Sequence, residues 1–213
     1  MMMLRKNVKL GFTLLSCLII CVPFMLGQKK VDTVAQQGRT YDFREDESRT
    51  DWVHITEGDG NEYTDSGSRI TNMRGRSFLL NINHQPRDLT IEVKAKKEYG
   101  PAYAWILPRF KDANNYYEIV LKEGMFGVCR RHHGKYTLIL EKKEVDLGDN
   151  TAPHLLKVKM VGEIPTITVW IDDKQLWTGK DETGLGILNG DFLALETEFS
   201  MVTIQRVTID GVK

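Results

Sequence analysis

The chain has 213 residues, of which 41% are hydrophobic and 27% are charged, a composition typical of a soluble globular protein with one core. Its 29 basic and 29 acidic residues balance, so no net charge attracts nucleic acid or an anionic membrane. We therefore predict no nucleic-acid partner.

The N-terminus has the pattern of a secretory signal. Three basic residues among the first nine precede an almost wholly apolar stretch at 10–26, and polar residues follow from position 28. A basic region before an apolar region of this kind directs export. The sequence predicts a signal peptide over 1–27 and a linker over 28–38.

Two other fates of this segment stay open. Residues 8–26 are near the lower length limit of a membrane-spanning helix and would serve as an uncleaved anchor. Cys17 ends a Leu-Leu-Ser-Cys sequence that has the look of a bacterial lipidation site. Each alternative places the domain outside the cytoplasm, secreted or periplasmic, with a membrane contact only through the N-terminal anchor.

From residue 39 onward the sequence alternates between apolar and polar residues in short runs separated by turn residues. This period of two indicates antiparallel strands with one face packed on a core. We expect deep burial of Leu89, Ile91, Val93, Tyr117, Ile119, Leu156, Val158, Ile167 and Val169. No segment shows a helical period, so the sequence predicts an all-β fold, a two-sheet antiparallel sandwich or jelly roll over 39–213, without a long helix after residue 30.

The segment 100–121 reads as two strands joined by a polar turn at 111–114. Trp105 and Arg109 share one side of the first strand, and Tyr116 and Glu118 occupy the phase of the second strand that faces away from the core. A short turn makes the two strands neighbours, so these four side chains are expected to converge on one face.

Aromatic rings bind the C–H faces of sugars, and charged planar groups bond to sugar hydroxyls. Further along the chain, a polar strand end contributes two residues to the rim of the same face. The predicted ligand-binding residues are Trp105, Arg109, Tyr116, Glu118, Arg130 and His132. The alternative interpretation places Trp105 in the core and pairs Arg109 with Glu118 as a cross-strand ion pair.

Other chemistry is not indicated. His132 and His133 are adjacent, so on a strand they point to opposite faces, and no third ligand stands at metal-binding spacing. The sequence contains no nucleophile elbow, phosphate loop or nucleotide fingerprint, and we predict no cofactor and no metal. Cys129 is expected to be a small buried residue, and His154 to be structural or solvated.

The order of these elements resembles that of concanavalin A-like lectin and glucanase jelly rolls. Within that group the chain is most similar to laminin-G-like modules and to the bacterial 3-keto-disaccharide hydrolase domain family. The resemblance covers most of 39–213 and is carried by the motifs at 88–93, 106–112, 114–117, 154–159, 166–176, 184–187 and 202–209.

The chain departs from the hydrolase family at two places. That family usually opens with a Phe-Asn-Gly motif before a tryptophan, whereas here Tyr41-Asp42-Phe43 precedes Trp52. Pro108 stands where the family more often has an aromatic residue, and its missing N–H predicts an edge strand or a bulge.

The resemblance implies an extracytoplasmic module that recognises carbohydrate or another cell-surface polymer. One alternative is a glycoside-acting hydrolase of the keto-disaccharide type, using a carboxylate near Arg109, and another is a structural adhesive module without a small ligand. Hydrolysis requires two carboxylates at a fixed separation. Glu196 and Glu198 share one strand face about 7 Å apart, a spacing that decides nothing.

Overall fold

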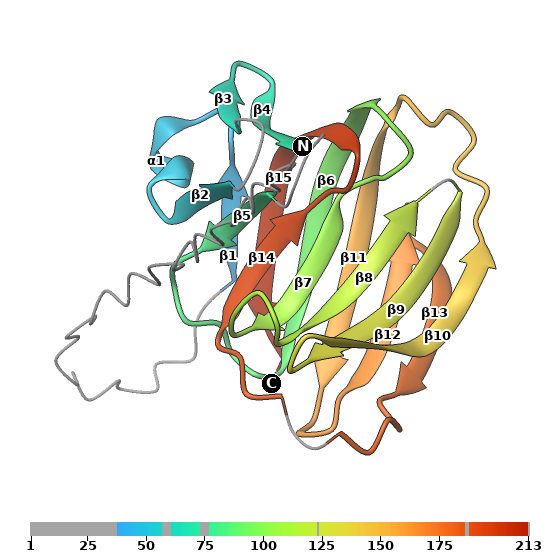
Figure 1. The fold of residues 1–213 in the computed structure, drawn as a ribbon. Coiled ribbons are helices and arrows are strands. Elements are labelled where there is room, and N and C mark those ends of the chain that lie inside the picture. The colour runs from blue at the N-terminus through green and yellow to red at the C-terminus, as the bar shows by residue number, and fades with distance from the viewer. Residues whose placement is uncertain (1–37, 57–60, 73–76, 123, 186–187, 213) are drawn as a thin grey trace, which may run out of the picture. The chain divides into compact units, whose positions relative to one another are not determined.

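The computed structural model describes residues 38–56, 61–72, 77–122, 124–185 and 188–212. The predicted signal, anchor or lipidation segment lies outside these residues. Within them, the strands form two sheets that face each other, and every strand pair is antiparallel (Figure 1). The predicted two-sheet antiparallel sandwich is confirmed.

One sheet has eight strands, with β1 paired to β15 beside the main order β13-β12-β11-β6-β15-β4-β3. Its strands are β1 (Arg39–Asp42), β3 (Glu62–Thr64), β4 (Gly67–Asn72), β6 (Leu89–Tyr99), β11 (Pro153–Val161), β12 (Thr166–Ile171), β13 (Lys174–Lys180) and β15 (Ser200–Gly211). The first strand of the domain thus pairs with its last.

The other sheet has seven strands in the order β10-β9-β8-β7-β14-β5-β2. They are β2 (Trp52–Thr56), β5 (Ser77–Asn81), β7 (Trp105–Phe110), β8 (Tyr116–Lys122), β9 (Met125–His132), β10 (Lys135–Glu144) and β14 (Phe192–Glu196). The one helix among the described residues is the four-residue α1 (Asp46–Arg49), in agreement with the prediction of no long helix. None of the described helical structure is long and apolar enough to span a membrane.

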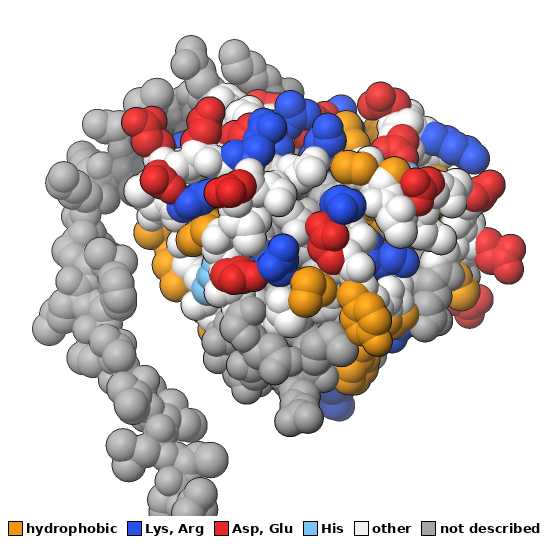
Figure 2. All heavy atoms as spheres, turned by 90° about the horizontal axis from the view of Figure 1, so that it is seen from above, with side chains coloured by type: hydrophobic (Ala, Val, Ile, Leu, Met, Phe, Trp, Pro, Cys, Tyr) orange, Lys and Arg blue, Asp and Glu red, His pale blue; other side chains and the backbone are white. Residues whose placement is uncertain are grey.

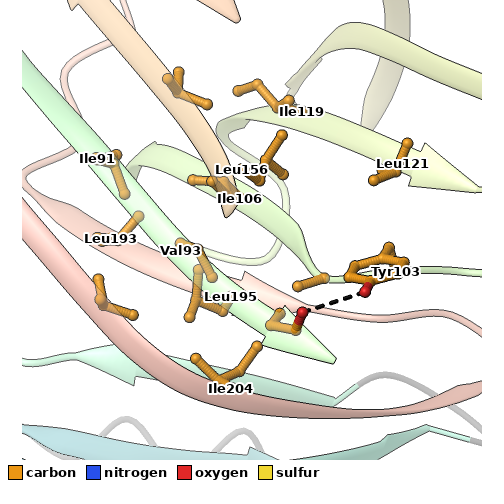
Figure 3. Packing of buried hydrophobic residues seen from close by; sticks show 14 of the residues in the cluster. Ile91, Val93, Tyr103, Ile106, Ile119, Leu121, Leu156, Leu193, Leu195 and Ile204 are labelled. Carbon is orange, nitrogen blue, oxygen red and sulfur yellow. Dashed lines mark hydrogen bonds between the residues drawn. The ribbon is translucent and has the colours of Figure 1, made fainter. Parts of the chain in front are cut away.

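The core fills the space between the two sheets. Ile91, Val93 and Leu156 from the eight-stranded sheet meet Ile106 and Ile119 from the seven-stranded sheet (Figure 3). All nine residues that the alternation marked for burial are at most 4% exposed, so the predicted core is confirmed. On the face that Figure 2 shows, basic and acidic side chains are interspersed.

The two sheets differ in how deeply the residues on their outer faces are buried. Along β6 buried residues alternate with more exposed ones, the pattern of a sheet with one face on the core. In contrast, all residues of β7 and six of the seven residues of β8 are buried. The outer face of the seven-stranded sheet is therefore a second buried surface.

Candidate functional site

A second apolar cluster lies on the outer face of the seven-stranded sheet. We call this surface the aromatic face; its residues are Phe78, Ala102, Trp105, Leu107, Phe110, Tyr116, Val120, Cys129 and Ala194. Side chains on a strand alternate between the two faces of the sheet, so β7 and β8 supply the main core with one set of residues and the aromatic face with the other. Here Phe110 stacks on Tyr116, with ring centroids 5.6 Å apart and an interplanar angle of 16°.

Two carboxylates stand among these apolar side chains. Glu118 shares the phase of Tyr116 and Val120 on β8 and is 3% exposed. Glu196 shares the phase of Ala194 on β14 and is 2% exposed. Burial of a carboxylate is costly unless it is hydrogen-bonded or neutral, so two of them on one apolar surface are candidates for a functional role.

Trp105 lies beside one of these carboxylates, because the sheet register pairs it with Glu196, which pairs in turn with Phe78 on the other side. The Trp105 side chain is 8% exposed, and its indole Nε1 has no hydrogen-bond partner among the residues that the structure describes. A buried donor without a partner costs about 1–3 kcal/mol. The indole N–H is therefore a buried donor that the described residues leave unsatisfied.

The β9–β10 side of the face carries further polar groups. Arg131 donates from Nη1 to the Tyr116 hydroxyl at 3.3 Å. The Tyr136 hydroxyl donates to Sγ of Cys129 at 2.7 Å, and Cys129 is 1% exposed, as its sequence predicted. Burial raises the pKa of Tyr136 well above its usual range, and the charge of Glu118 adds to the increase. Tyr136 thus remains a neutral donor at physiological pH.

Arg109 does not join this face, and its predicted position was wrong. Its φ of 50° lies in the left-handed region, and the register between β14 and β7 shifts at this point. The bulge reverses the side-chain phase, so the guanidinium donates to the carbonyls of Gly162 at 2.5 Å, Glu163 at 2.9 Å and Arg87 at 3.3 Å. The alternative ion pair with Glu118 is wrong for the same reason.

Pro108 accounts for the bulge. β7 lies between β8 and β14, so of the two possibilities that the proline raised, an edge or a bulge, the structure has the bulge. The backbone of Gly190 packs against it closely: a Cβ at Gly190 would lie 1.9 Å from the carbonyl oxygen of Arg109.

Arg130 also points away from the aromatic face, which corrects its predicted place on the rim. It is 1% exposed, and its Nη1 forms an ion pair with Oδ2 of Asp181 at 2.7 Å. The Tyr117 hydroxyl donates to the same oxygen at 2.6 Å, and Thr183 donates to Oδ1 from both its backbone N–H and its hydroxyl. Burial alone would raise the pKa of Asp181, but the hydrogen bonds from Tyr117, Thr183 and Arg130 outweigh it and lower that pKa.

His132 stands at the end of β9 with its ring against that of His133, at a centroid distance of 4.2 Å. Burial lowers the pKa of His132, and the neighbouring His133 and Arg130 lower it further. The described part of the chain contains no group of three or more side chains able to hold a metal ion.

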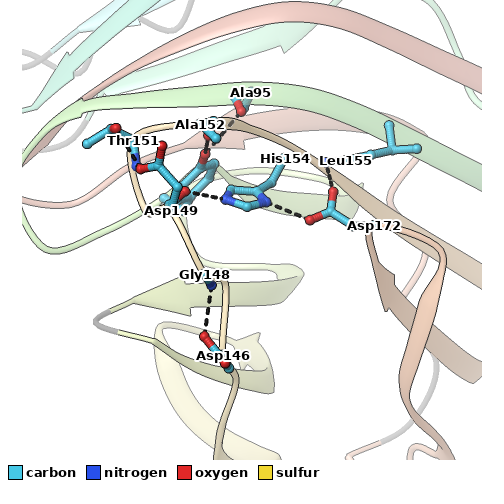
Figure 4. Close-up of polar contacts among 10 residues, drawn as sticks. Ala95, Asp146, Gly148, Asp149, Thr151, Ala152, His154, Leu155 and Asp172 are labelled. Carbon is cyan, nitrogen blue, oxygen red and sulfur yellow. Dashed lines mark hydrogen bonds and ion pairs between the residues drawn. The ribbon is translucent and has the colours of Figure 1, made fainter.

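A polar network that the sequence did not reveal surrounds His154 at the start of β11 (Figure 4). Its Nδ1 lies 2.6 Å from Oδ2 of Asp172 and its Nε2 lies 2.9 Å from the carbonyl oxygen of Asp149. The Tyr103 hydroxyl donates to the carbonyls of Ala152 at 2.6 Å and Ala95 at 3.2 Å, and burial raises its pKa to about 12. These contacts tie β11 to its flanking loops, so His154 has a structural role.

The structure thus brings Trp105, Tyr116 and Glu118 together on one face, as their alternation predicted, and removes Arg109 and Arg130 from it. Sequence reasoning did not assign Glu196 to this face. The sequence could have indicated this place, because Glu196 follows Ala194 by two residues in an apolar strand and residues two apart point to the same face. The same argument identified Glu118.

No family model and no curated protein matches the sequence. Solved structures do match. The carbohydrate-binding module CBM66 from Bacillus subtilis has a TM-score of 0.63 and 19% identity, over 76% of this chain and 96% of that one. The Bacillus licheniformis β-glucanase has a TM-score of 0.62 and 10% identity, over 84% and 100%. A Bacillus subtilis protein of unknown function with a galectin-like fold has a TM-score of 0.64 and 8% identity, over 83% and 97%.

At these identities the likeness concerns the fold, and the closer resemblance to laminin-G-like modules and keto-disaccharide hydrolases stays a prediction. The chain has the fold that its sequence predicted, a concanavalin A-like jelly-roll sandwich.

Proposed function

We propose that the aromatic face binds carbohydrate and that the protein is a carbohydrate-recognition module. The observation that carries this proposal is the unpaired indole N–H of Trp105 on a strand position paired with the buried Glu196, with a second buried carboxylate, Glu118, on the same otherwise apolar surface. Sugars present C–H faces that pack on aromatic rings and hydroxyls that bond to carboxylates and indole N–H groups. The face supplies both kinds of contact.

The arrangement of the strands suits an extended ligand. Following the register across β2, β5, β14 and β7 gives a continuous apolar row of Val53, Leu80, Ala194 and Leu107. On the far side of β8 the row from Glu118 continues through Cys129 to Leu138. Seven strands at about 4.8 Å spacing make this row about 29 Å long, enough for several sugar residues in line.

Two of the structurally similar proteins are described as binding carbohydrate, which supports the proposal. One is the carbohydrate-binding module already described. The other is the lumenal domain of VIP36 in its Ca²⁺/Man3GlcNAc-bound form, with a TM-score of 0.56 and 13% identity over 84% of this chain and 91% of that one.

The proposal is tested by calorimetric titration of the full chain with β-glucan, chito- and manno-oligosaccharides. Trp105→Phe retains an aromatic ring and removes the N–H, so we expect roughly fivefold to tenfold weaker binding. The matched control is Trp170→Phe, because Trp170 is partly buried on β12 in the other sheet, with Lys157 Nζ 5.7 Å from its ring. Absence of binding to every oligosaccharide, or equal weakening by both substitutions, would refute the proposal.

The two carboxylates favour a second candidate function, cleavage or transfer of a glycosidic bond. Glu118 and Glu196 stand on strands separated by β7 and are offset by two residues along it, so their backbones are about 12 Å apart. Glutamate side chains that lean toward each other would reach the separation at which paired carboxylates act on a glycosidic bond.

A reducing-end assay on the same oligosaccharides separates the two functions. For an enzyme, Glu118→Gln and Glu196→Gln should each lower turnover by roughly 10²–10⁴-fold with affinity retained. The control is Glu198→Gln, because Glu198 is more exposed and pairs with Lys122 at 2.7 Å. Binding without release of reducing ends by the unmodified chain would leave the recognition module as the function.

A further inference from the structure

A small cavity lies apart from the aromatic face, next to the buried ion pair of Arg130. Its volume is about 180 Å³, and its lining residues are Arg130, Ile164, Asp181, Gly184 and Leu185. Arg130 follows Cys129 on β9, and adjacent residues on a strand point to opposite faces, so the cavity is on the inner side of the seven-stranded sheet. Nothing proposed above uses it.

The guanidinium of Arg130 has one satisfied side and one unsatisfied side. Its Nη1 pairs with Asp181 at 2.7 Å. Its Nη2 makes only a long contact of 3.4 Å with the carbonyl oxygen of Leu185, and its Nε has no partner among the described residues. Nε and Nη2 lie side by side with parallel N–H bonds, the fork that carboxylates occupy in bidentate pairs.

The buried charges near the cavity also favour binding of an anion. Arg109 is a second buried guanidinium near Arg130, and its Nε too lacks a partner among the described residues. Within the described part of this inner region, Asp181 is the one carboxylate buried with them. Asp88 and the Arg87–Glu163 ion pair, at 3.8 Å, are more exposed, so among the buried groups alone two positive charges face one negative charge. A buried excess charge is unfavourable unless an opposite charge compensates it.

The walls of the cavity limit what the anion can be. Ile164 and Leu185 are apolar and present a surface for the C–H groups of a ring. The volume is below the roughly 300 Å³ at which pockets for drug-sized ligands begin, so a single ring fits and a polymer does not. Gly184 adds no side chain to the opening.

We propose that this cavity is a second ligand site, for the carboxylate of a single acidic sugar of the uronate class, held by the Nε and Nη2 of Arg130 with its ring on Ile164 and Leu185. The site goes beyond the proposed function of the aromatic face. It would let the domain recognise a free acidic sugar or the acidic end of a chain.

The test is calorimetric titration of the full chain with glucuronate, glucose, acetate and inorganic phosphate. We expect glucuronate to bind at least roughly tenfold more tightly than the other three, because glucose lacks the charge, acetate lacks the ring and phosphate lacks the planar pair of oxygens. Equal binding of glucose, stronger binding of phosphate, or no binding of glucuronate would each overturn the proposal.

A matched pair of variants locates the site. Ile164 and Ile82 are both 48% exposed, but only Ile164 lines the cavity. Ile164→Glu places a negative charge at the opening and should weaken glucuronate binding roughly tenfold, whereas Ile82→Glu should leave it unchanged. Equal effects of the two substitutions would overturn the proposal. Neutral oligosaccharides report on the aromatic face in the same preparations, so failure of one site is distinguishable from failure of the other.

Discussion

Replacement of Asp181 by asparagine tests the interior ion pair directly. The carboxylate and its partner Arg130 each have side chains that are 1% exposed, so solvent does not screen their interaction. The asparagine amide would retain an oxygen for the hydroxyl of Tyr117 but would leave the guanidinium buried without a counter-charge. Breaking a buried pair in this way costs about 3–5 kcal/mol, and the retained hydrogen bonds place our expectation near 3 kcal/mol.

The assay is urea denaturation of the full chain, followed by tryptophan fluorescence at several pH values. The folded-state pKa of Asp181 is lowered, so its contribution to stability is complete above its ordinary pKa of about 3.9 and is lost as pH falls through the lower folded value. The difference between the unmodified chain and Asp181→Asn should therefore persist from pH 7 to pH 5 and shrink in stronger acid.

The control is Asp191→Asn, since the Asp191 side chain is 66% exposed and its removal should change stability by less than about 0.5 kcal/mol. A loss below 1 kcal/mol for Asp181→Asn, or a loss that does not diminish in acid, would show that the pair does not stabilise the fold as argued.

Three further outcomes are expected from urea denaturation. Gly190→Ala should destabilise the fold by about 1–3 kcal/mol, because the new Cβ would lie 1.9 Å from a backbone oxygen. The control Gly148→Ala should cost about 1 kcal/mol, because Gly148 has a φ of 62° but no atom within 4 Å of the new Cβ. Equal losses for the two substitutions would contradict the close approach at Gly190. Tyr103→Phe should cost about 1 kcal/mol at neutral pH. The raised pKa of the Tyr103 hydroxyl stabilises the native state below pH 10, and this contribution is lost between pH 10 and 12, so the variant should lack that alkaline loss of stability. A variant with the same alkaline profile as the unmodified protein would contradict this. Asp172→Asn should destabilise the fold by about 1 kcal/mol because it weakens the contact with His154. Asparagine accepts the backbone φ of 48° at this position as aspartate does, so the backbone adds no further cost. An unchanged stability would show that the contact with His154 does not stabilise the fold.

The alternation of apolar residues was sufficient to predict the fold class and the core. It failed at Arg109 because a single bulge reverses the phase of every side chain that follows, and the position of a bulge depends on the partner strand. Pro108 indicated that some irregularity was present and could not indicate where the next side chain would point.

Arg130 was misplaced for a different reason. Its phase on β9, in register with the core residue Tyr117, already pointed inward. A charged residue is rarely fully buried, so composition favoured the rim, and the carboxylate that compensates it, Asp181, lies 51 positions further along the chain. The burial of both faces of β7 could have been predicted from the sequence, because the nearly continuous apolar run at 102–107 is typical of strands that are covered on two sides.

The pairing of the first strand with the last has a consequence for how the domain is made. Residues of β1 align with Arg206, Val207, Thr208 and Ile209 of β15, and β15 itself lies between β6 and β4. During synthesis the N-terminal half therefore lacks a central strand of its sheet until the C-terminus has emerged, and β6 keeps an unpaired edge that can recruit other chains. Such long-range closure gives a high contact order and folding in milliseconds to seconds. A chain that stops before residue 200 would remain open at the middle of its sheet, however complete its core residues are.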